Sequence, residues 1–494
     1  DPSKLSIPGA NVIVKGTNRG ASTDFDGKFT IKVSEGETLV FSFVGFLKKE
    51  LKIGASTTYN VSLDAESSNL NEVVVIGYGT QKKKLTTGAI SGIKTENFTE
   101  RPISRIDQGL IGQVAGVRVK QTTGLPGQPF SIEIRGSGSI TAGNEPLYVV
   151  DGFPIYTEGS NSNGGFSSGS PLDNMNPNDV ESIEVLKDAA AASIYGSRAS
   201  NGVVLITTKK GKKGKTKFTF NMYGGVNKEA NRVDMLSAQG WIDRAKTMID
   251  SQWVGSGIAG ASASQNNAER IAAYNAKNPT APLNTANTRY YTYLYDERWD
   301  IPGHPGLDYI DWQDKVFRTG EFNNYQLSAS GATDVVNYYV SANYQKNTGY
   351  IIGTDYTLFS ARANVDFKLS ENFKTGINIA PSYSIRNDPG VEGKDNTLFK
   401  ALVATPVFES ASNAAGEKYT TRYAWGSSTT NMLNALARTG KNSMYRTLIS
   451  TYASYQFVKG LTWKTTLNFD NSDNTTESYT PNDVQASIRG AYNT

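Results

Sequence analysis

"TLFSARANVDFKL", residues 357–369, alternates between two kinds of side chain along its whole length. Its odd positions hold threonine or apolar residues. From position 360 the even positions hold Ser360, Arg362, Asn364, Asp366 and Lys368. A period of two residues is that of a β-strand, whose successive side chains point to opposite faces. The stretch therefore predicts a long strand with one apolar and one polar face.

Four other runs repeat this pattern, and one of them is less regular. They are residues 336–344, 373–385, 461–469 and, less cleanly, 445–457. The apolar face carries no charged residue in any of the five runs. Strands of 9–13 residues exceed the usual length of about 5–6. A charge in the middle of a lipid-facing band would cost roughly 2–4 kcal/mol. The pattern favours a transmembrane β-barrel, and a soluble β-sheet is the alternative.

The rest of the chain divides into segments with different predicted secondary structure. Residues 1–66 predict a small β-sandwich, with strands in 11–17, 27–33, 38–46 and 59–64. Residues 85–214 read as a mixed α/β segment, with a short helix at Ala189–Ala192 between two strands. Residues 215–494 hold the alternating runs, and about 227–320 predicts one long polar and aromatic loop.

Composition argues against several classes of protein. The 494 residues include no cysteine, and 50 lysines and arginines against 46 acidic residues leave a net charge of only +4. A disulfide scaffold is excluded, and we expect no nucleic-acid partner. His304 is the single histidine, so we expect no catalytic residues, no metal site and no cofactor. The run "TDFDGKF", residues 23–29, fits an Asp-Gly turn better than a calcium loop.

"NEVVVIGYGTQKKK", residues 71–84, is unusual because four β-branched residues follow a soft polar run. It has the sequence of a strand without a sheet of its own. An extended segment of this kind can add to the sheet edge of another protein through backbone hydrogen bonds. The alternative is an edge strand of the N-terminal sandwich. We place this stretch in a linker, residues 67–84.

Four motifs together resemble one family of outer-membrane transporters. They are "LNEVVVIGYGTQKK", "IRGSGS", "PLYVVDGFPI" and "SIEVLKDAAAASIYGSRASNGVVLITTKKG". These motifs are similar to those of the SusC/RagA family of TonB-dependent transporters, and the resemblance covers essentially the whole chain. It implies a mainly β protein with a carboxypeptidase-regulatory-like β-sandwich at 1–66, an α/β plug domain at 85–214 and the first strands of a barrel of about 22 strands.

The resemblance also predicts that the sequence is the N-terminal part of a longer chain. Seven or eight strands between 216 and 494 cannot both close a barrel and enclose the segment before them. Family members usually end in an aromatic residue, whereas this sequence ends in Thr494. Asn71 also stands where an aspartate is common in the family.

The implied function is import of a bulky nutrient, a glycan or an oligopeptide, across the bacterial outer membrane. The inner-membrane proton gradient would drive it through TonB with ExbB and ExbD. The implied TonB box, on the periplasmic side with the N-terminal domain, comprises Glu72, Val73, Val74, Val75, Ile76, Gly77, Tyr78 and Gly79. Other implied partners are outer-membrane lipid, a SusD-like surface lipoprotein lid and a second transporter–lid pair.

Two sets of residues are candidates for contacts inside such a transporter. We interpret Arg135, Asp151, Glu184 and Lys187 as contacts between plug and barrel rather than ligand contacts. Candidate ligand contacts in the long extracellular loop, residues 227–320, are Tyr290, Tyr291, Trp299 and Trp312. The alternative functions are a TonB-dependent receptor for a siderophore or other small ligand, and a surface glycan-binding or adhesion protein without transport.

Overall fold

The architecture is taken from a computed structural model of the 494-residue chain. It describes residues 6–17, 19–43, 46, 48–63, 73–76, 79–82, 90–94, 103–121, 123–136, 144–155, 170–391, 397–409, 423–425, 436 and 438–480. The chain forms two compact units. One unit contains residues 1–90 and 186–197, and the other contains residues 91–185 and 198–494.

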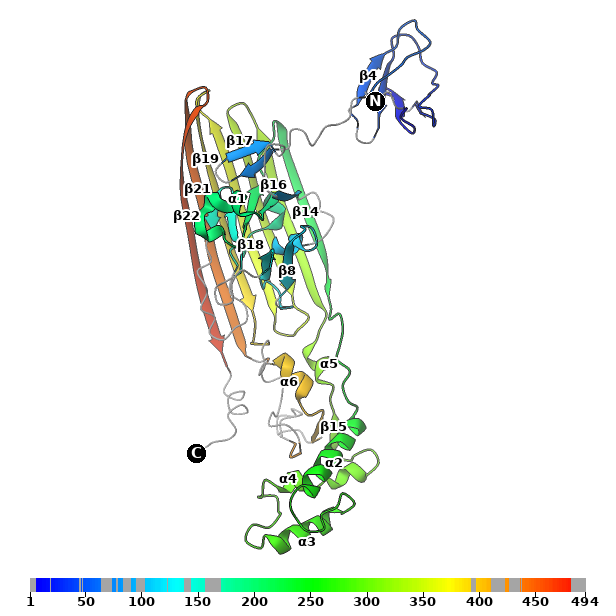
Figure 1. Ribbon diagram of the computed structural model, residues 1–494, viewed down its shortest axis with the longest axis vertical. Helices are drawn as coiled ribbons and strands as arrows, with labels where there is room; N and C mark the ends of the chain where they lie inside the picture. The colour runs from blue at the N-terminus through cyan, green and yellow to red at the C-terminus, as the bar shows by residue number, and fades with distance from the viewer. Residues whose placement is uncertain are drawn as a thin grey trace. The chain divides into compact units, whose positions relative to one another are not determined.

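The N-terminal domain is built on one four-stranded antiparallel sheet (Figure 1). Its strands are β1 (Asn11–Val14), β2 (Gly20–Ser22), β3 (Thr38–Ser42) and β4 (Lys49–Lys52), in the order β2-β1-β3-β4. Val12 and Val14 of β1 and Leu39 and Phe41 of β3 point to one face and are buried. Alternating strands therefore supply the domain core, as the sequence predicts.

Two predicted strands of this domain are absent from the described sheet. Residues 27–33 and 59–63 join no ladder, so the prediction of strands there is wrong. Their alternating apolar side chains still pack on the core, which explains the misleading pattern. The acidic stretch forms the predicted turn: Asp24 Oδ1 accepts from the backbone N–H of Asp26 and Lys28 at 3.0 and 2.8 Å.

The β-branched stretch that seemed to lack a sheet pairs with the residues directly after it. Strand β5 (Val73–Ile76) is antiparallel to β6 (Gly79–Lys82), with Val73 opposite Lys82 and Ile76 opposite Gly79. Each described strand has this one partner. One edge of β5 is therefore occupied by a local hairpin.

The plug segment, as we call residues 85–214, contains a five-stranded sheet of order β11-β10-β13-β12-β7. The strands are β7 (Ile90–Lys94), β10 (Leu147–Val150), β11 (Phe153–Ile155), β12 (Val180–Leu186) and β13 (Val203–Thr208). Between β12 and β13 the chain forms α1 (Ala189–Ala192) and the 3-10 turns of η5 (Ser193–Ala199), so the predicted helix is confirmed.

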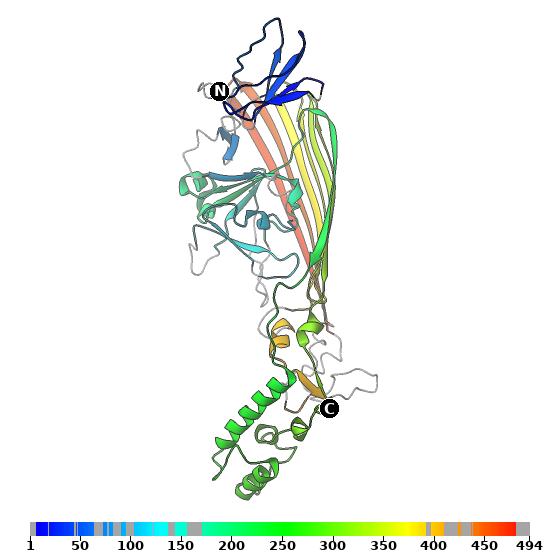
Figure 2. The same ribbon diagram turned by 90° about the vertical axis from the view of Figure 1, so that its right-hand side faces the viewer.

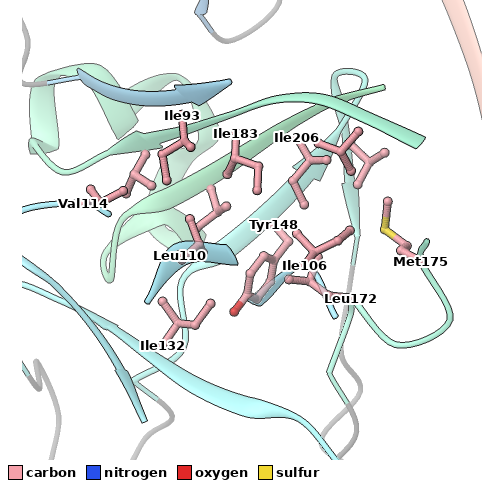
Figure 3. Packing of buried hydrophobic residues seen from close by; sticks show 14 of the residues in the cluster. Ile93, Ile106, Leu110, Val114, Ile132, Tyr148, Leu172, Met175, Ile183 and Ile206 are labelled. Atoms are coloured by element: carbon pink, nitrogen blue, oxygen red, sulfur yellow. The ribbon is translucent and has the colours of Figure 1, made fainter. Parts of the chain in front are cut away.

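The core of the plug segment lies against this sheet and a separate hairpin. The hairpin consists of β8 (Val117–Gln121) and β9 (Phe130–Ile134), and two short 3-10 helices are η3 (Asp107–Leu110) and η4 (Pro177–Asp179). Figure 3 shows Ile132 of β9, Ile183 of β12 and Ile206 of β13 converging with Tyr148. Residues from widely separated parts of the sequence thus share one core.

The alternating runs form one seven-stranded antiparallel sheet, which we call the large sheet. Its members, in spatial order, are β14 (Gly214–Asn227), β16 (Gly320–Ala332), β17 (Val336–Thr348), β18 (Asp355–Lys368), β19 (Phe373–Asn387), β21 (Thr439–Val458) and β22 (Leu461–Tyr479). Figure 1 shows them side by side from green to red. The count and the five predicted runs are confirmed.

One face of the large sheet is apolar and exposed in the described chain. Phe359 of β18 is 47% exposed, whereas Asn364 on the other face is 6% exposed. The register aligns aromatic side chains of neighbouring strands into one row: Tyr325, Tyr344, Phe359, Tyr383 and Tyr445. Aromatic rows at the edge of an apolar band are typical of barrels in outer membranes.

The segment predicted as a long loop between β14 and β16 is folded, which corrects that expectation. It contains α2 (Ala238–Val254), α3 (Asn267–Lys277), α4 (Tyr290–Tyr293), η6 (Glu297–Asp300), β15 (Leu307–Tyr309) and α5 (Trp312–Val316). Strand β15 pairs with β20 (Val407–Glu409), which follows α6 (Thr397–Val403). Among the described residues, no helix is long and apolar enough to cross a membrane.

Candidate functional site

The plug segment meets the large sheet through polar side chains, and Asp179 is at the centre of this contact. Asp179, at the end of η4, is only 4% exposed. Its Oδ1 accepts hydrogen bonds from Gln326 Nε2 at 2.9 Å, Tyr339 OH at 2.9 Å and Ser341 Oγ at 2.7 Å. Three donors on two strands thus bind one buried carboxylate oxygen.

Arg362 of β18 lies between two carboxylates of the plug segment. Its side chain is 5% exposed and forms ion pairs with Asp179 at 3.8 Å and Asp151 at 3.9 Å. Its Nη1 also donates to Asn378 Oδ1 of β19 at 3.1 Å. A charge this deeply buried needs an opposite charge beside it, because desolvation alone would be very unfavourable.

Asp151 makes the plug–barrel contacts that the sequence predicted for it. It occupies the turn between β10 and β11 with a φ of +49°, a conformation that only a few per cent of non-glycine residues adopt. Its Oδ2 accepts from Asn378 Nδ2 at 2.7 Å and from Thr208 Oγ1 at 2.6 Å. Asn364 of β18 in turn donates to the same Thr208 hydroxyl at 2.9 Å. The turn is thereby tied to two strands of the large sheet.

Further polar contacts extend along the same boundary, which we call the polar seam. Tyr356 OH donates to Asn174 Oδ1 at 3.3 Å, and Arg446 Nη1 donates to the carbonyl of Pro171 at 2.7 Å. Arg446 is itself paired with Asp470 of β22 at 2.8 Å. Figure 2 shows the plug strands on one side of the large sheet, where these contacts lie.

The contacts of the seam are polar and partly charged, which sets them apart from an apolar interface. Each hydrogen bond in it exchanges with hydrogen bonds to water, so its net contribution is about 0.5–1.5 kcal/mol between neutral groups and about 1.5–3 kcal/mol where Asp179, Asp151 or Arg446 takes part. An apolar interface of similar size would resist hydration much more strongly. The plug segment has its own apolar core, and Leu448 of β21 in the large sheet packs against that core.

The other predicted plug positions have varied surroundings. Glu184 is 7% exposed and accepts a hydrogen bond from Ser182 within the same strand at 3.5 Å. Arg135 is exposed and has a φ of +59°, directly after β9. Lys187 is half-buried and directly follows β12. Asp179 was missed because an aspartate in "NPNDV" has no distinguishing local pattern.

The predicted TonB box is described only in part. Val73 to Ile76 form β5 and Gly79 begins β6, whereas Glu72, Gly77 and Tyr78 lie outside the described residues. The register places Ile76 opposite Gly79 at the end of the hairpin. Antiparallel pairs alternate between hydrogen-bonded and non-hydrogen-bonded positions. Alternate residues of β5 therefore direct their backbone N–H and C=O groups away from β6.

The structure separates the four predicted ligand-contacting aromatics. Tyr291 and Trp299 line a cavity of about 660 Å³, and Tyr290 and Trp312 are not among its lining residues. Trp312 is 1% exposed, packs on Phe408 and donates to the carbonyl of Thr405 at 3.1 Å. Tyr290 packs edge-on against Tyr291, with ring centroids 5.2 Å apart.

The cavity also receives aromatic residues that the sequence did not single out. Trp241 of α2 and Trp425 each contact Trp299, with centroids 5.9 Å away in both cases. Trp299 Nε1 donates to Tyr423 OH at 2.6 Å, and Tyr423 OH donates to Asp296 Oδ2 at 2.7 Å. Their positions in the sequence span 184 residues from 241 to 425, so no local pattern could have grouped them.

Asp296 is the acidic anchor of this aromatic cluster. Burial raises the pKa of Asp296, but hydrogen bonds from the Arg298 and Tyr423 side chains more than offset that effect. The pKa of Asp296 therefore lies below its ordinary value. The carboxylate stays ionised at neutral pH and can hold both donors.

Two family descriptions match separate parts of the chain. Residues 1–75 match the CarboxypepD_reg-like domain, and residues 82–203 match the TonB-dependent Receptor Plug Domain. The second range includes η4 with Asp179 and the turn with Asp151.

Whole-chain comparisons extend the similarity into the large sheet. TonB-dependent receptor P26 of Formosa agariphila is 35% identical over 96% of this chain and 43% of its own length. TonB-dependent receptor SusC of Bacteroides thetaiotaomicron is 35% identical over 74% of this chain and 31% of its own length. The solved RagAB peptide importer in the "open-open" state is 30% identical, covers 82% of this chain and 43% of that chain, and has a TM-score of 0.61. The chain spans less than half the length of these relatives, which are described as receptors and an importer.

Proposed function

The chain belongs to the SusC/RagA-type TonB-dependent receptors, which are outer-membrane β-barrel proteins, and on that premise we propose that it takes part in energised nutrient import. The cargo is a bulky glycan or oligopeptide, and the direction is inward across the outer membrane. The plug blocks the lumen of the barrel until a pull from the periplasm remodels it. The polar seam around Asp179 is the observation that carries this proposal.

The polar seam supports a gating role because its contacts are specific and because water can replace them. Arg362 and the donors to Asp179 fix one docked position of the plug on the large sheet. Water can take over these hydrogen bonds when the plug shifts, and the contact of Leu448 with the plug core has to be broken as well. A plug that never moved would be held more firmly by an apolar contact with the sheet.

The hairpin β5–β6 supports a coupling role for the TonB box. Alternate residues of β5 would offer backbone N–H and C=O groups at the edge that faces away from β6, where a strand of TonB can add. TonB, energised by ExbB and ExbD, then pulls on this strand. Backbone pairing depends little on side chains, which suits one coupling protein that serves many receptors.

The relatives support an outer partner as well. RagAB is described as a peptide importer in an "open-open" state, which is consistent with a movable lid over each barrel. For this chain we propose a SusD-like surface lipoprotein as the lid, and an assembly of two transporter–lid pairs. Extensive identity with P26 and SusC favours this assignment over a siderophore receptor or an adhesion protein.

A pair of substitutions in β5 tests the coupling role. Val75→Pro removes one backbone N–H of β5, and Val75→Thr keeps it together with a β-branched side chain. We expect Val75→Pro to abolish energised uptake of the nutrient and to leave its binding to purified receptor unchanged. Val75→Thr should retain uptake. Uptake that survives Val75→Pro and deletion of residues 71–79 would refute TonB coupling.

A further inference from the structure

The 660 Å³ cavity beside α2 has the form of a binding site rather than a packing gap. Helix α2 presents to it the residues Trp241, Arg244, Ala245, Met248, Ile249 and Gln252. Their spacing of three and four residues places them on one face of the helix. Residues 402–406 and Trp425, which are remote from α2 in sequence, also line it. The tertiary structure therefore builds this cavity from several segments.

Apolar side chains around the cavity are unusually exposed. Met248 is 51% exposed, Val233 is 55% exposed and Val403 is 59% exposed, and all three line the cavity. Contiguous exposed apolar groups at a concavity mark a site that binds something. Thirteen of the nineteen lining residues are apolar, so an occupant can bury apolar groups here beside the polar part of the lining.

Two indole N–H groups of the lining are not available to a sugar. The indole N–H of Trp299 donates to Tyr423 at 2.6 Å, and that of Trp425 donates to the carbonyl of Leu294 at 2.8 Å. Both groups are thus already satisfied within the protein. A glycan hydroxyl buried here without a partner would cost about 1–3 kcal/mol. An apolar side chain would gain roughly 25 cal/mol for each Å² that it buries.

Two opposite charges complete the lining. Within the part of the chain that the structure describes, Arg244 and Asp234 line the cavity, are exposed and take part in no ion pair. Arg244 can therefore accept a carboxylate as a ligand, and Asp234 an ammonium group. A short peptide carries both groups at its ends and can carry a bulky apolar side chain between them.

We propose that this cavity binds the large apolar side chain of a short peptide, with the peptide carboxylate at Arg244 and its ammonium group at Asp234. The biological meaning of this site rests on the proposed import function, and the site would select peptide over glycan as cargo. It lies outside the polar seam and shares no lining residue with it. Its occupancy can therefore be measured without energised transport.

The test is calorimetric titration of the full-length receptor, purified in detergent, with the tetrapeptide Ala-Trp-Leu-Ala and separately with maltotetraose. We expect the peptide to bind and the sugar not to bind. Met248→Glu, at an exposed position, should weaken peptide binding at least about tenfold. Thr247→Ala, on the adjacent exposed face of α2, should leave the affinity unchanged.

The charge assignment has its own control. Arg244→Gln should weaken the binding of the peptide with a free carboxylate about fivefold and leave the binding of the C-terminally amidated peptide unchanged. The proposal would be overturned if Met248→Glu left the affinity for the peptide unchanged. It would also be overturned if maltotetraose bound and Met248→Glu abolished that binding. If the cavity fails this test but Val75→Pro still abolishes uptake, the proposed import function stands and only the peptide site is refuted.

Discussion

Ser341 of β17 donates a hydrogen bond of 2.7 Å to Asp179 of the plug, although 162 residues separate them in the sequence. Both side chains are buried, at 3% and 4% exposure. A contact of such long range is formed only after plug and sheet have both folded. It records the docked state of the plug, and substitutions at this point should report on docking directly.

Asp179→Asn should loosen the plug without unfolding it. The amide retains one acceptor oxygen for the three neutral donors but removes the charge that faces Arg362. Because Arg362 keeps Asp151 and Asn378, we expect a loss of about 1–3 kcal/mol in docking stability. Faster hydrogen exchange in β17 and higher single-channel conductance would show it. Glu181→Gln, whose ion pair with Lys212 is exposed, is the control, and equal behaviour of the two variants would contradict the prediction.

Arg362→Met should be more damaging than Asp179→Asn. It leaves the carboxylates of Asp151 and Asp179 near each other without a cation between them, a loss of about 3–5 kcal/mol. Urea unfolding of the purified receptor measures the change. The double variant Arg362→Met/Asp179→Leu should lose less than the sum of the single variants, and strict additivity would refute their coupling. Arg118→Met, which removes an exposed pair, should cost no more than about 1 kcal/mol.

Acid should loosen the aromatic cluster around Asp296. The pKa of Asp296 is lowered in the folded state, so the carboxylate contributes stability at pH values above its unfolded pKa. That contribution is lost as the pH falls through the folded pKa. Tryptophan fluorescence of the receptor should therefore show a transition in the acidic range. Tyr423→Phe removes one donor and should move the transition to higher pH, and an unchanged midpoint would contradict this assignment.

A charge placed on the apolar face of the large sheet should hinder insertion into lipid. Ala363 is opposite Val340 and Ile379 and lies between Phe359 and Phe367 on its own strand. Ala363→Arg should destabilise the lipid-inserted protein by about 2–4 kcal/mol, because the charge would lie near the middle of the band. Urea titration of receptor folded into vesicles measures this cost. Thr475→Arg on β22, beyond the aromatic row, is the matched control. Equal stability of both variants would disprove a lipid contact.

Several features of the fold were predictable because they depend on local periodicity. The alternation in 357–369 places Phe359 and Asn364 on opposite faces, and the structure confirms this. The helix at Ala189–Ala192 and the turn at Asp24 also follow from neighbouring residues alone. A capping box at Asn266 and Glu269 begins α3 and was readable in "NNAE", but the polar composition around it favoured a loop.

The sequence by itself determined the large sheet, its apolar face and the family, because a two-residue period and long motifs are properties of adjacent residues. Only the tertiary structure decided that Asp179, Ser341 and Arg362 share one seam and that Trp241, Trp299 and Trp425 share one cavity. The physical reason is that these groups are selected by burial and by pairing between residues that are far apart in the sequence. Neither burial nor such pairing produces a periodic pattern in the sequence.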